Sequence, residues 1–116
     1  MYLLCISFYF RHLGEFNALS KIAKLFAKHL KVEEQVAYLE STVVRLAVGT
    51  PNRIAKLVEV GALKLDDLTL VLVDCSKDVK QRSIFDVPEV RADLFHLVED
   101  HCWVPLRTNQ LRIALF

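Results

Sequence analysis

Residues 44–74, VRLAVGTPNRIAKLVEVGALKLDDLTLVLVD, contain the pattern that decides the fold. A short apolar run, Val44 to Val48, is strand-like and leads into Gly49, after which apolar residues recur at helical spacing. Thr50 is a favourable N-cap, and Pro51 suits the first helical position because its missing N–H has no intrahelical role there. This stretch therefore predicts a strand that opens directly into a helix.

The second half of the same stretch ends the helix and begins another strand. Gly61 suits the left-handed residue that follows a helix. The run from Leu68 to Val73 is almost continuously apolar before Asp74, which is typical of a parallel strand buried on both faces. Strand, helix and strand in this order form the unit of a parallel α/β domain, and the helical connection is expected to cross over right-handed.

The flanking sequence continues the alternation of strands and helices. Tyr2 to Tyr9 is predicted as a buried strand and residues 111–116, LRIALF, as a last strand. Lys31 to Ser41 is predicted as a helix with one apolar face, and Asp86 to His101 as a longer helix. Ser20 to Ala27 fits a helix about as well as a short strand, because its apolar residues satisfy both periods.

Composition and charge are those of one globular domain. The chain has 116 residues, of which 53% are hydrophobic and 25% charged, and its 15 basic and 14 acidic residues leave a net charge of +1. This balance provides no general attraction to nucleic acid, so any RNA contact must depend on local geometry. Three cysteines without a C-x-x-C pair indicate a reducing compartment. The longest apolar run, MYLLCISFYF, is too short to span a bilayer, so no membrane contact is expected.

Two polar loops follow predicted strands, and several motifs near them resemble a known family. Thr50-Pro51-Asn52-Arg53 is similar to the T-P-G-R element in the first RecA-like domain of DEAD-box RNA helicases, and Asp74-Cys75-Ser76-Lys77 lies where that domain has D-E-A-D. The wider pattern, with KLFAKHLKVEEQV at 24–36, DVPEV at 86–90 and the terminal LRIALF, resembles the Cms-type ribosomal small-subunit biogenesis family. Members of that family are degenerate relatives of the helicase domain.

The resemblance implies a fold as well as a function. The expected fold is α/β, an incomplete RecA-like (P-loop NTPase-type) domain of three layers with a mostly parallel sheet. Residues 20–116 are expected to form this degenerate helicase-like domain. Residues 1–19 match the family pattern poorly and are interpreted as a divergent or truncated segment that contributes an edge strand.

In the helicases the T-P-G-R element binds the RNA backbone, so the resemblance implies RNA binding by Thr50, Pro51, Asn52 and Arg53. A helix N-terminus offers free N–H groups and a partial positive charge to a phosphate, and an arginine adds a planar donor fork. Asn52 stands where the motif has Gly, which puts close approach of the backbone to RNA in doubt. The alternative interpretation is an ordinary helix cap with a solvated Arg53.

The residues for nucleotide hydrolysis are missing from this sequence. A P-loop needs G-x-x-x-x-G-K-[ST], whereas no glycine here is followed by lysine. At the D-E-A-D position Asp74 remains, but Cys75 replaces the glutamate, and Ser76 and Lys77 complete the departure. We therefore expect no enzymatic activity and no bound nucleotide, cofactor or metal, and we interpret Asp74 as a polar residue that ends a buried strand.

Other chemically reactive side chains have simpler explanations. Cys75 could act as a nucleophile only with a partner base, which the sequence does not place. His96 and Glu99 are expected to share a helix face and His101 to point elsewhere, so these residues and Cys102 do not form a zinc pattern.

A basic cluster and several large aromatic residues leave two readings open. The cluster is either solvated or helps to hold RNA, and it consists of Lys21, Lys24, Lys28, His29 and Lys31. Trp103 and the phenylalanines are interpreted as core or as part of a face covered by a partner.

The sequence thus predicts a non-catalytic ribosome biogenesis factor of the small-subunit pre-ribosome, located in the nucleus and nucleolus. Its expected partners are pre-ribosomal RNA, small-subunit assembly proteins, or both. Two alternatives stay open: a pure protein–protein interaction module without RNA contact, and a small thiol-dependent enzyme that uses Cys75.

Overall fold

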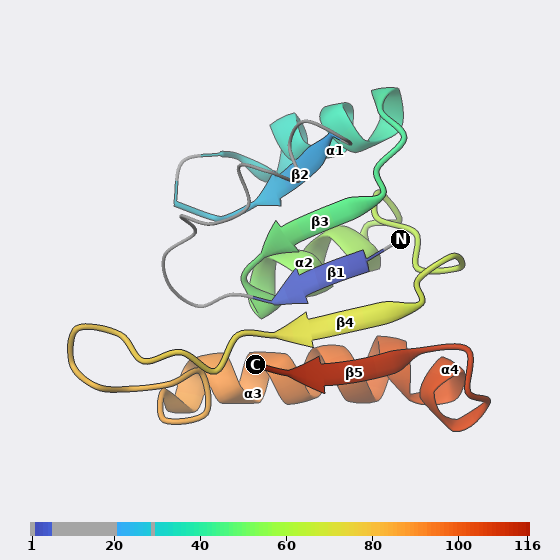
Figure 1. The fold of residues 1–116 in the computed structure, drawn as a ribbon. Coiled ribbons are helices and arrows are strands. Elements are labelled where there is room, and N and C mark those ends of the chain that lie inside the picture. The colour runs from blue at the N-terminus through green and yellow to red at the C-terminus, as the bar shows by residue number, and fades with distance from the viewer. Residues whose placement is uncertain (1, 6–20, 29) are drawn as a thin grey trace.

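Five parallel strands form a single sheet in the structure, which is a computed structural model that describes residues 2–5, 21–28 and 30–116. The order across the sheet is β2-β3-β1-β4-β5 (Figure 1). The strands are β1 (Tyr2–Cys5), β2 (Ile22–Leu25), β3 (Leu46–Gly49), β4 (Leu70–Val73) and β5 (Arg112–Leu115). The prediction of an α/β fold with a parallel sheet is confirmed.

The helices follow the strands in the predicted order. They are α1 (Val32–Ser41), α2 (Pro51–Glu59), α3 (Pro88–Leu97), the π-helical turn η2 (Val98–Cys102) and α4 (Trp103–Arg107). The helix predicted to end at His101 continues to Arg107, while the ambiguous Ser20–Ala27 segment contains strand β2. None of the helices that the structure describes has the length and apolar character needed to cross a lipid bilayer.

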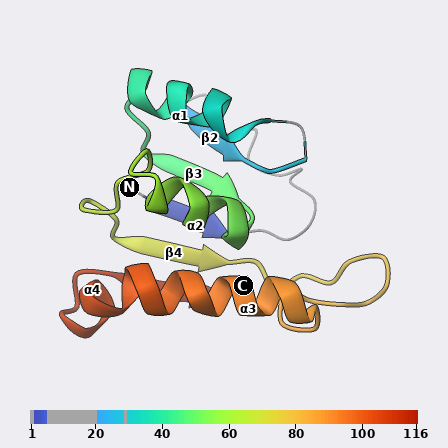
Figure 2. The ribbon, with the colours of Figure 1, turned by 180° about the vertical axis from the view of Figure 1, so that it is seen from behind.

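All described helices lie on one face of the sheet (Figures 1 and 2). The steps from β2 to β3, from β3 to β4 and from β4 to β5 all run in the same direction across the sheet. Right-handed crossovers that step in one direction place their helices on the same face. The described part of the chain therefore has two layers, where the sequence predicted three.

Strand β1 differs in position from the prediction for residues 1–19. It was expected at an edge, but it pairs with β3 on one side and with β4 on the other. An unbroken apolar run is typical of a central parallel strand, and this explains the position better than an edge. The remainder of the predicted strand, residues 6–9, lies outside the described residues.

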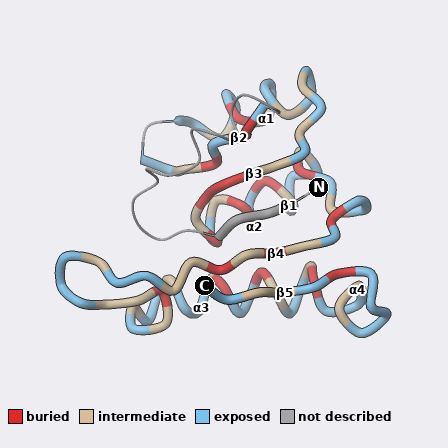
Figure 3. Tube along the Cα trace, in the orientation of Figure 1, coloured by how far each residue is buried: buried red, intermediate tan, exposed pale blue. Residues whose placement is uncertain are grey.

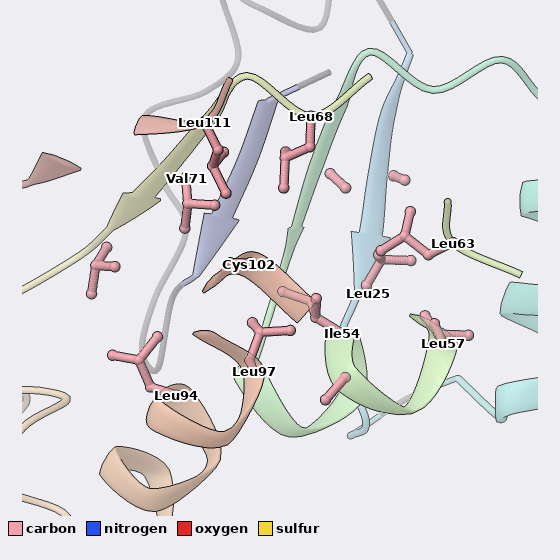
Figure 4. Packing of buried hydrophobic residues seen from close by; sticks show 14 of the residues in the cluster. Leu25, Ile54, Leu57, Leu63, Leu68, Val71, Leu94, Leu97, Cys102 and Leu111 are labelled. Carbon is pink, nitrogen blue, oxygen red and sulfur yellow. The ribbon is translucent and has the colours of Figure 1, made fainter. Parts of the chain in front are cut away.

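The main core fills the space between the sheet and its helices. Leu25 from β2, Ile54 and Leu57 from α2, and Leu94 and Leu97 from α3 converge there with their side chains almost fully buried (Figure 4). A smaller cluster around Ile22 and Val48 lies on the opposite side of the sheet, as the alternation along a strand requires. Buried residues gather along β3 and the inward sides of α2 and α3 (Figure 3).

At two positions the structure requires glycine, each for a different reason. Gly61 follows α2 with φ 79°, which confirms the predicted left-handed residue. Gly49, at the end of β3, lies so close to β2 that a Cβ atom built on it would meet the carbonyl oxygen of Leu25. The absence of a side chain at Gly49 therefore allows β3 to enter α2 directly beside β2.

Replacement of Gly49 by alanine should destabilise the fold by about 2 kcal/mol or more, because the new methyl group would force β2 and β3 apart. Gly61→Ala is the comparison, since it meets open space and carries only left-handed strain of about 1 kcal/mol. Chemical denaturation of both variants and the parent measures the difference. Equal losses at the two positions would contradict the close approach at Gly49.

Candidate nucleic-acid interface

The candidate interface lies at the edge of the sheet where the parallel strands end. Because β3, β1 and β4 are neighbours and parallel, the loops that begin with Thr50 and Asp74 lie at the same edge. The structure thus places the two sequence-predicted motifs on one side of the molecule. The two loops are separated by the width of β1, since β3 and β4 do not pair directly.

The start of α2 is formed as predicted, with one difference. Thr50 is the N-cap and Pro51 the first helical residue, but the Thr50 side chain makes no capping hydrogen bond. Pro51 is buried and Asn52 is exposed. Asn52 has ordinary helical backbone angles, so the change from Gly to Asn does not strain this turn. The backbone N–H groups of Asn52 and Arg53 belong to the first turn, which has no intrahelical acceptors for them.

Arg53 is partly buried and tied to its surroundings by one nitrogen. Its Nη1 donates to the carbonyl oxygen of Leu30 and to Oε1 of Gln35, each at 2.8 Å. Among the described residues, its Nε and Nη2 have no hydrogen-bond partner. Arg53 therefore holds α2 against the segment before α1 through Nη1. The alternative of an ordinary helix cap with a solvated Arg53 stays a prediction, because the rest of the guanidinium is not engaged by the described residues.

Gln35 is the residue that sequence reasoning missed. Its side chain on α1 is almost fully buried, with a relative exposure of 2%. Besides accepting from Arg53, its Nε2 donates to the carbonyl oxygens of Lys24 at 3.3 Å and Phe26 at 3.1 Å. One signal in the sequence could have identified it. Gln35 is a polar residue on the face of the predicted helix that is otherwise apolar, and an amide buried on such a face needs specific hydrogen-bond partners.

The second loop contains the residues at the D-E-A-D position. Oδ1 of Asp74 accepts the backbone N–H of Ser76 at 2.8 Å, so Asp74 shapes a turn after β4, which agrees with its predicted structural role. The N–H of Cys75 donates to the carbonyl oxygen of Phe116 at 2.7 Å, and its thiol donates to the carbonyl oxygen of Val73 at 3.7 Å. Within the described residues, no base side chain is bonded to this thiol. Lys77 is exposed.

Carboxylates order the rest of this loop. Asp78 accepts the backbone N–H groups of Lys80 and Arg82 and forms an ion pair with the Arg82 guanidinium at 2.9 Å. The backbone hydrogen bond from Arg82 is the main cause that holds the pKa of Asp78 below its ordinary value, and the Arg82 side chain contributes as well. The backbone N–H of Ser83 lowers the pKa of Asp86 in the same way. Both carboxylates are therefore charged at neutral pH.

The histidines near the end of α3 correct one prediction. His101 was expected to point away from His96, but the two rings lie edge to face with their centroids 6.5 Å apart. The cause is the π-helical turn, whose wider repeat brings residues five apart to the same side. His96 also contacts Asp100 at 2.9 Å and Glu59 of α2 at 3.5 Å. In the described ranges, no group of three His, Cys, Asp or Glu residues is arranged to hold a metal.

The remaining sequence-predicted residues are mostly at the surface. Lys21, Lys24, Lys28 and Lys31 are exposed, and His29 lies outside the described residues. Trp103, Phe95 and Phe116 have more than half of their surface exposed, so the core interpretation is wrong for them. Phe95 and Trp103 lie on helices α3 and α4, and Phe116 follows β5, the last strand in the order of the sheet, where few neighbours can cover such side chains.

The fold and this edge define a small parallel α/β domain with two polar loops at the carboxyl ends of its strands. Residues 10–104 match the model of the family described as CMS1, a U3-containing 90S pre-ribosomal complex subunit. This match covers most of the chain, and the chain therefore belongs to the Cms1 family, as the sequence resemblance predicted.

Individual relatives agree with this membership. Protein CMSS1 of Homo sapiens is 41% identical over 107 residues, which is 91% of this chain and 38% of the relative. Protein CMSS1 of Danio rerio is 40% identical over 107 residues, or 91% of this chain and 37% of the relative. Protein CMS1 of Chaetomium thermophilum is 49% identical over 80 residues, or 68% of this chain and 32% of the relative. The chain thus spans less than two fifths of the length of these relatives. No solved structure matches it.

Replacement of Gln35 by methionine should lower the free energy of unfolding by about 2–3 kcal/mol, because it leaves two backbone carbonyls without a donor and Arg53 with one of its two acceptors. Ala37→Met places the same side chain on the exposed side of α1 and should change stability by less than about 0.5 kcal/mol. Urea denaturation measures both. A Gln35→Met variant as stable as the parent would remove the structural role of this amide.

Cys75 and Cys102 should differ in their reactivity toward alkylating reagents. Burial raises the pKa of Cys102 to about 11, because it disfavours the thiolate. At pH 8 only about one Cys102 in a thousand is then ionised, so iodoacetamide should label folded Cys102 at least tenfold more slowly than the partly exposed Cys75 (roughly, from thiolate fraction and access). Peptide mapping by mass spectrometry follows each thiol, and the two rates should converge in denaturant. Equal rates in the folded chain would contradict the buried position.

Proposed function

We propose that this chain is a non-catalytic component of small-subunit ribosome assembly that contacts pre-ribosomal RNA through the start of α2. Its family is described as a subunit of the 90S pre-ribosomal complex, which supports a place in ribosome biogenesis. A nuclear and nucleolar location follows from such a role. Small-subunit assembly proteins are the natural second class of partner.

The observation that carries the RNA contact is the geometry at Asn52 and Arg53. Asn52 is exposed at the first turn of a nine-residue helix, at the edge of the sheet where ligands of parallel α/β domains bind. Two nitrogens of Arg53, Nε and Nη2, have no partner among the described residues, while Nη1 is held by Leu30 and Gln35. A phosphate at this position would meet a preorganised guanidinium and the positive end of the helix dipole.

The loops at the same edge also support descent from a helicase domain that has lost the residues for ATP hydrolysis. We interpret the parallel sheet as a reduced RecA-like domain in which Thr50–Arg53 corresponds to the T-P-G-R element of DEAD-box helicases. Asp74 is engaged in a turn with Ser76, and Cys75 stands where the helicases have a glutamate. Both features favour binding over phosphoryl transfer.

The two rival functions have weaker support. A thiol-dependent enzyme would need a base beside Cys75, and its thiol contacts a backbone carbonyl instead. A pure protein-interaction module is favoured by the exposed aromatic side chains of Trp103, Phe95 and Phe116. That rival differs from the RNA-binding proposal in its dependence on salt, because phosphate contacts weaken steeply as salt rises.

An Asn52→Asp substitution tests the proposed contact. A carboxylate here would repel phosphate, yet it suits the first turn of a helix, so folding should be unaffected or slightly improved. We expect about tenfold weaker binding of a fluorescent transcript of small-subunit pre-ribosomal RNA, the equivalent of losing about one phosphate-binding interaction. Fluorescence anisotropy over a range of salt concentrations provides the measurement.

Asn109→Asp is the matched control, because Asn109 is exposed in the turn before β5, at the opposite edge of the sheet. It makes the same change of charge and should leave affinity nearly intact. If Asn52→Asp and Asn109→Asp bind the transcript equally well, or if binding by the parent is independent of salt, the RNA contact at α2 is refuted and the protein-interaction alternative is preferred.

A further inference from the structure

A groove between strand β2 and helix α1 lies beside the proposed RNA contact and shares with it Leu30 and Gln35, the two residues that hold Arg53. Its volume is about 370 Å³, which is sufficient for one or two large side chains of a partner. The groove is lined by Ile22, Lys24, Leu25, Leu30, Glu34, Gln35 and Tyr38. We call these residues the β2–α1 groove.

The surface of the β2–α1 groove is mainly apolar. Ile22 and Leu25 are buried, while Leu30 is 41% exposed and Tyr38 is 37% exposed. The exposed leucine and tyrosine share one concave site with the two buried aliphatic residues, so an apolar side chain placed there would remove Leu30 and Tyr38 from water.

The edge of β2 does not offer a place for an added strand. Such an addition needs free backbone carbonyls on the outer edge. The carbonyl oxygens of Lys24 and Phe26 accept hydrogen bonds from Gln35, which lies across this edge. A partner must therefore enter the groove with side chains and not by extending the sheet.

The chain segment that borders the groove, from β2 to the start of α1, is basic. Residues 21–31 include Lys21, Lys24, Lys28 and Lys31 and contain no acidic residue. All four lysines are exposed. Lys24 and Glu34 are the charged residues among the described lining, and the carboxylate of Glu34 already accepts the backbone N–H of Lys31 at 2.9 Å. A partner with carboxylates beside its apolar side chain would complement this arrangement.

We propose that the β2–α1 groove binds an acidic segment of a neighbouring assembly protein, which inserts a leucine-like or phenylalanine-like side chain against Leu30 and Tyr38. The aliphatic floor favours a protein over RNA, because unpaired bases are normally held by stacking between aromatic rings, and Tyr38 is the single aromatic side chain among the described residues that line the groove. This inference rests on the proposed function and deepens it, since it assigns an assembly protein to a surface apart from Asn52.

Selection from a displayed library of short random-sequence peptides tests the proposal on the full chain. Leu30→Asp is the main variant, because a charge at this partly exposed position should spoil the groove while the core stays intact. Val79→Asp is its matched control, since Val79 is 99% exposed and lies outside the groove. Lys24→Glu provides a second variant that leaves the apolar surface unchanged, so the test does not depend on the folding of Leu30→Asp.

We expect the selected peptides to be acidic with one or two large apolar residues. They should bind Leu30→Asp and Lys24→Glu about tenfold more weakly than the parent, and Val79→Asp as well as the parent. Three outcomes would overturn the proposal: no enrichment, enrichment of peptides without acidic and apolar character, or binding to both groove variants that is as tight as binding to the parent. A uridine-rich RNA that crosslinks to Tyr38 and displaces the peptides would identify the groove as an RNA surface instead. The RNA test at Asn52 is unaffected by any of these results.

Discussion

The buried amide of Gln35 is the interaction on which the arrangement of the first half of the domain depends. It joins three segments that are distant in sequence: the edge strand β2, helix α1 on which it lies, and the start of α2 through Arg53. A buried amide is stable only when its donors and acceptor are paired, so these partners must keep their relative positions. The orientation of Arg53 and the shape of the β2–α1 groove both follow from this one side chain.

The direction of the chain across the sheet determines where function can be located. Three successive crossovers step the same way, which places all described helices on one face and leaves the strand ends together at one edge. Gly49 allows one of these crossovers to begin, since β3 turns into α2 directly against the backbone of Leu25. The start of α2 is therefore presented at the strand ends with Pro51 buried and Asn52 exposed.

Local chemistry was enough to predict the elements around α2. Thr50, Pro51 and Gly61 each have a conformational preference that depends on few neighbours, and each occupies the predicted position. Strand β2 was ambiguous because its four residues satisfy two periods, and pairing with β3 decides the matter. Gln35 and the bonds of Arg53 depend on contacts across nine to twenty-three residues, which no local pattern contains. The place of the candidate site could be predicted, whereas its internal bonds could not.

The π-helical turn between α3 and α4 has a consequence for the lengths of chain that this helix can accommodate. Pro105 lacks the N–H that would bond the carbonyl of His101 in an ordinary helix, and the wider turn lies immediately before it. Such a turn holds one more residue than a regular helix of the same length. A relative could lose a single residue between positions 98 and 102 and keep both flanking helices in place, so length variation can be absorbed inside this helix as well as in the loops.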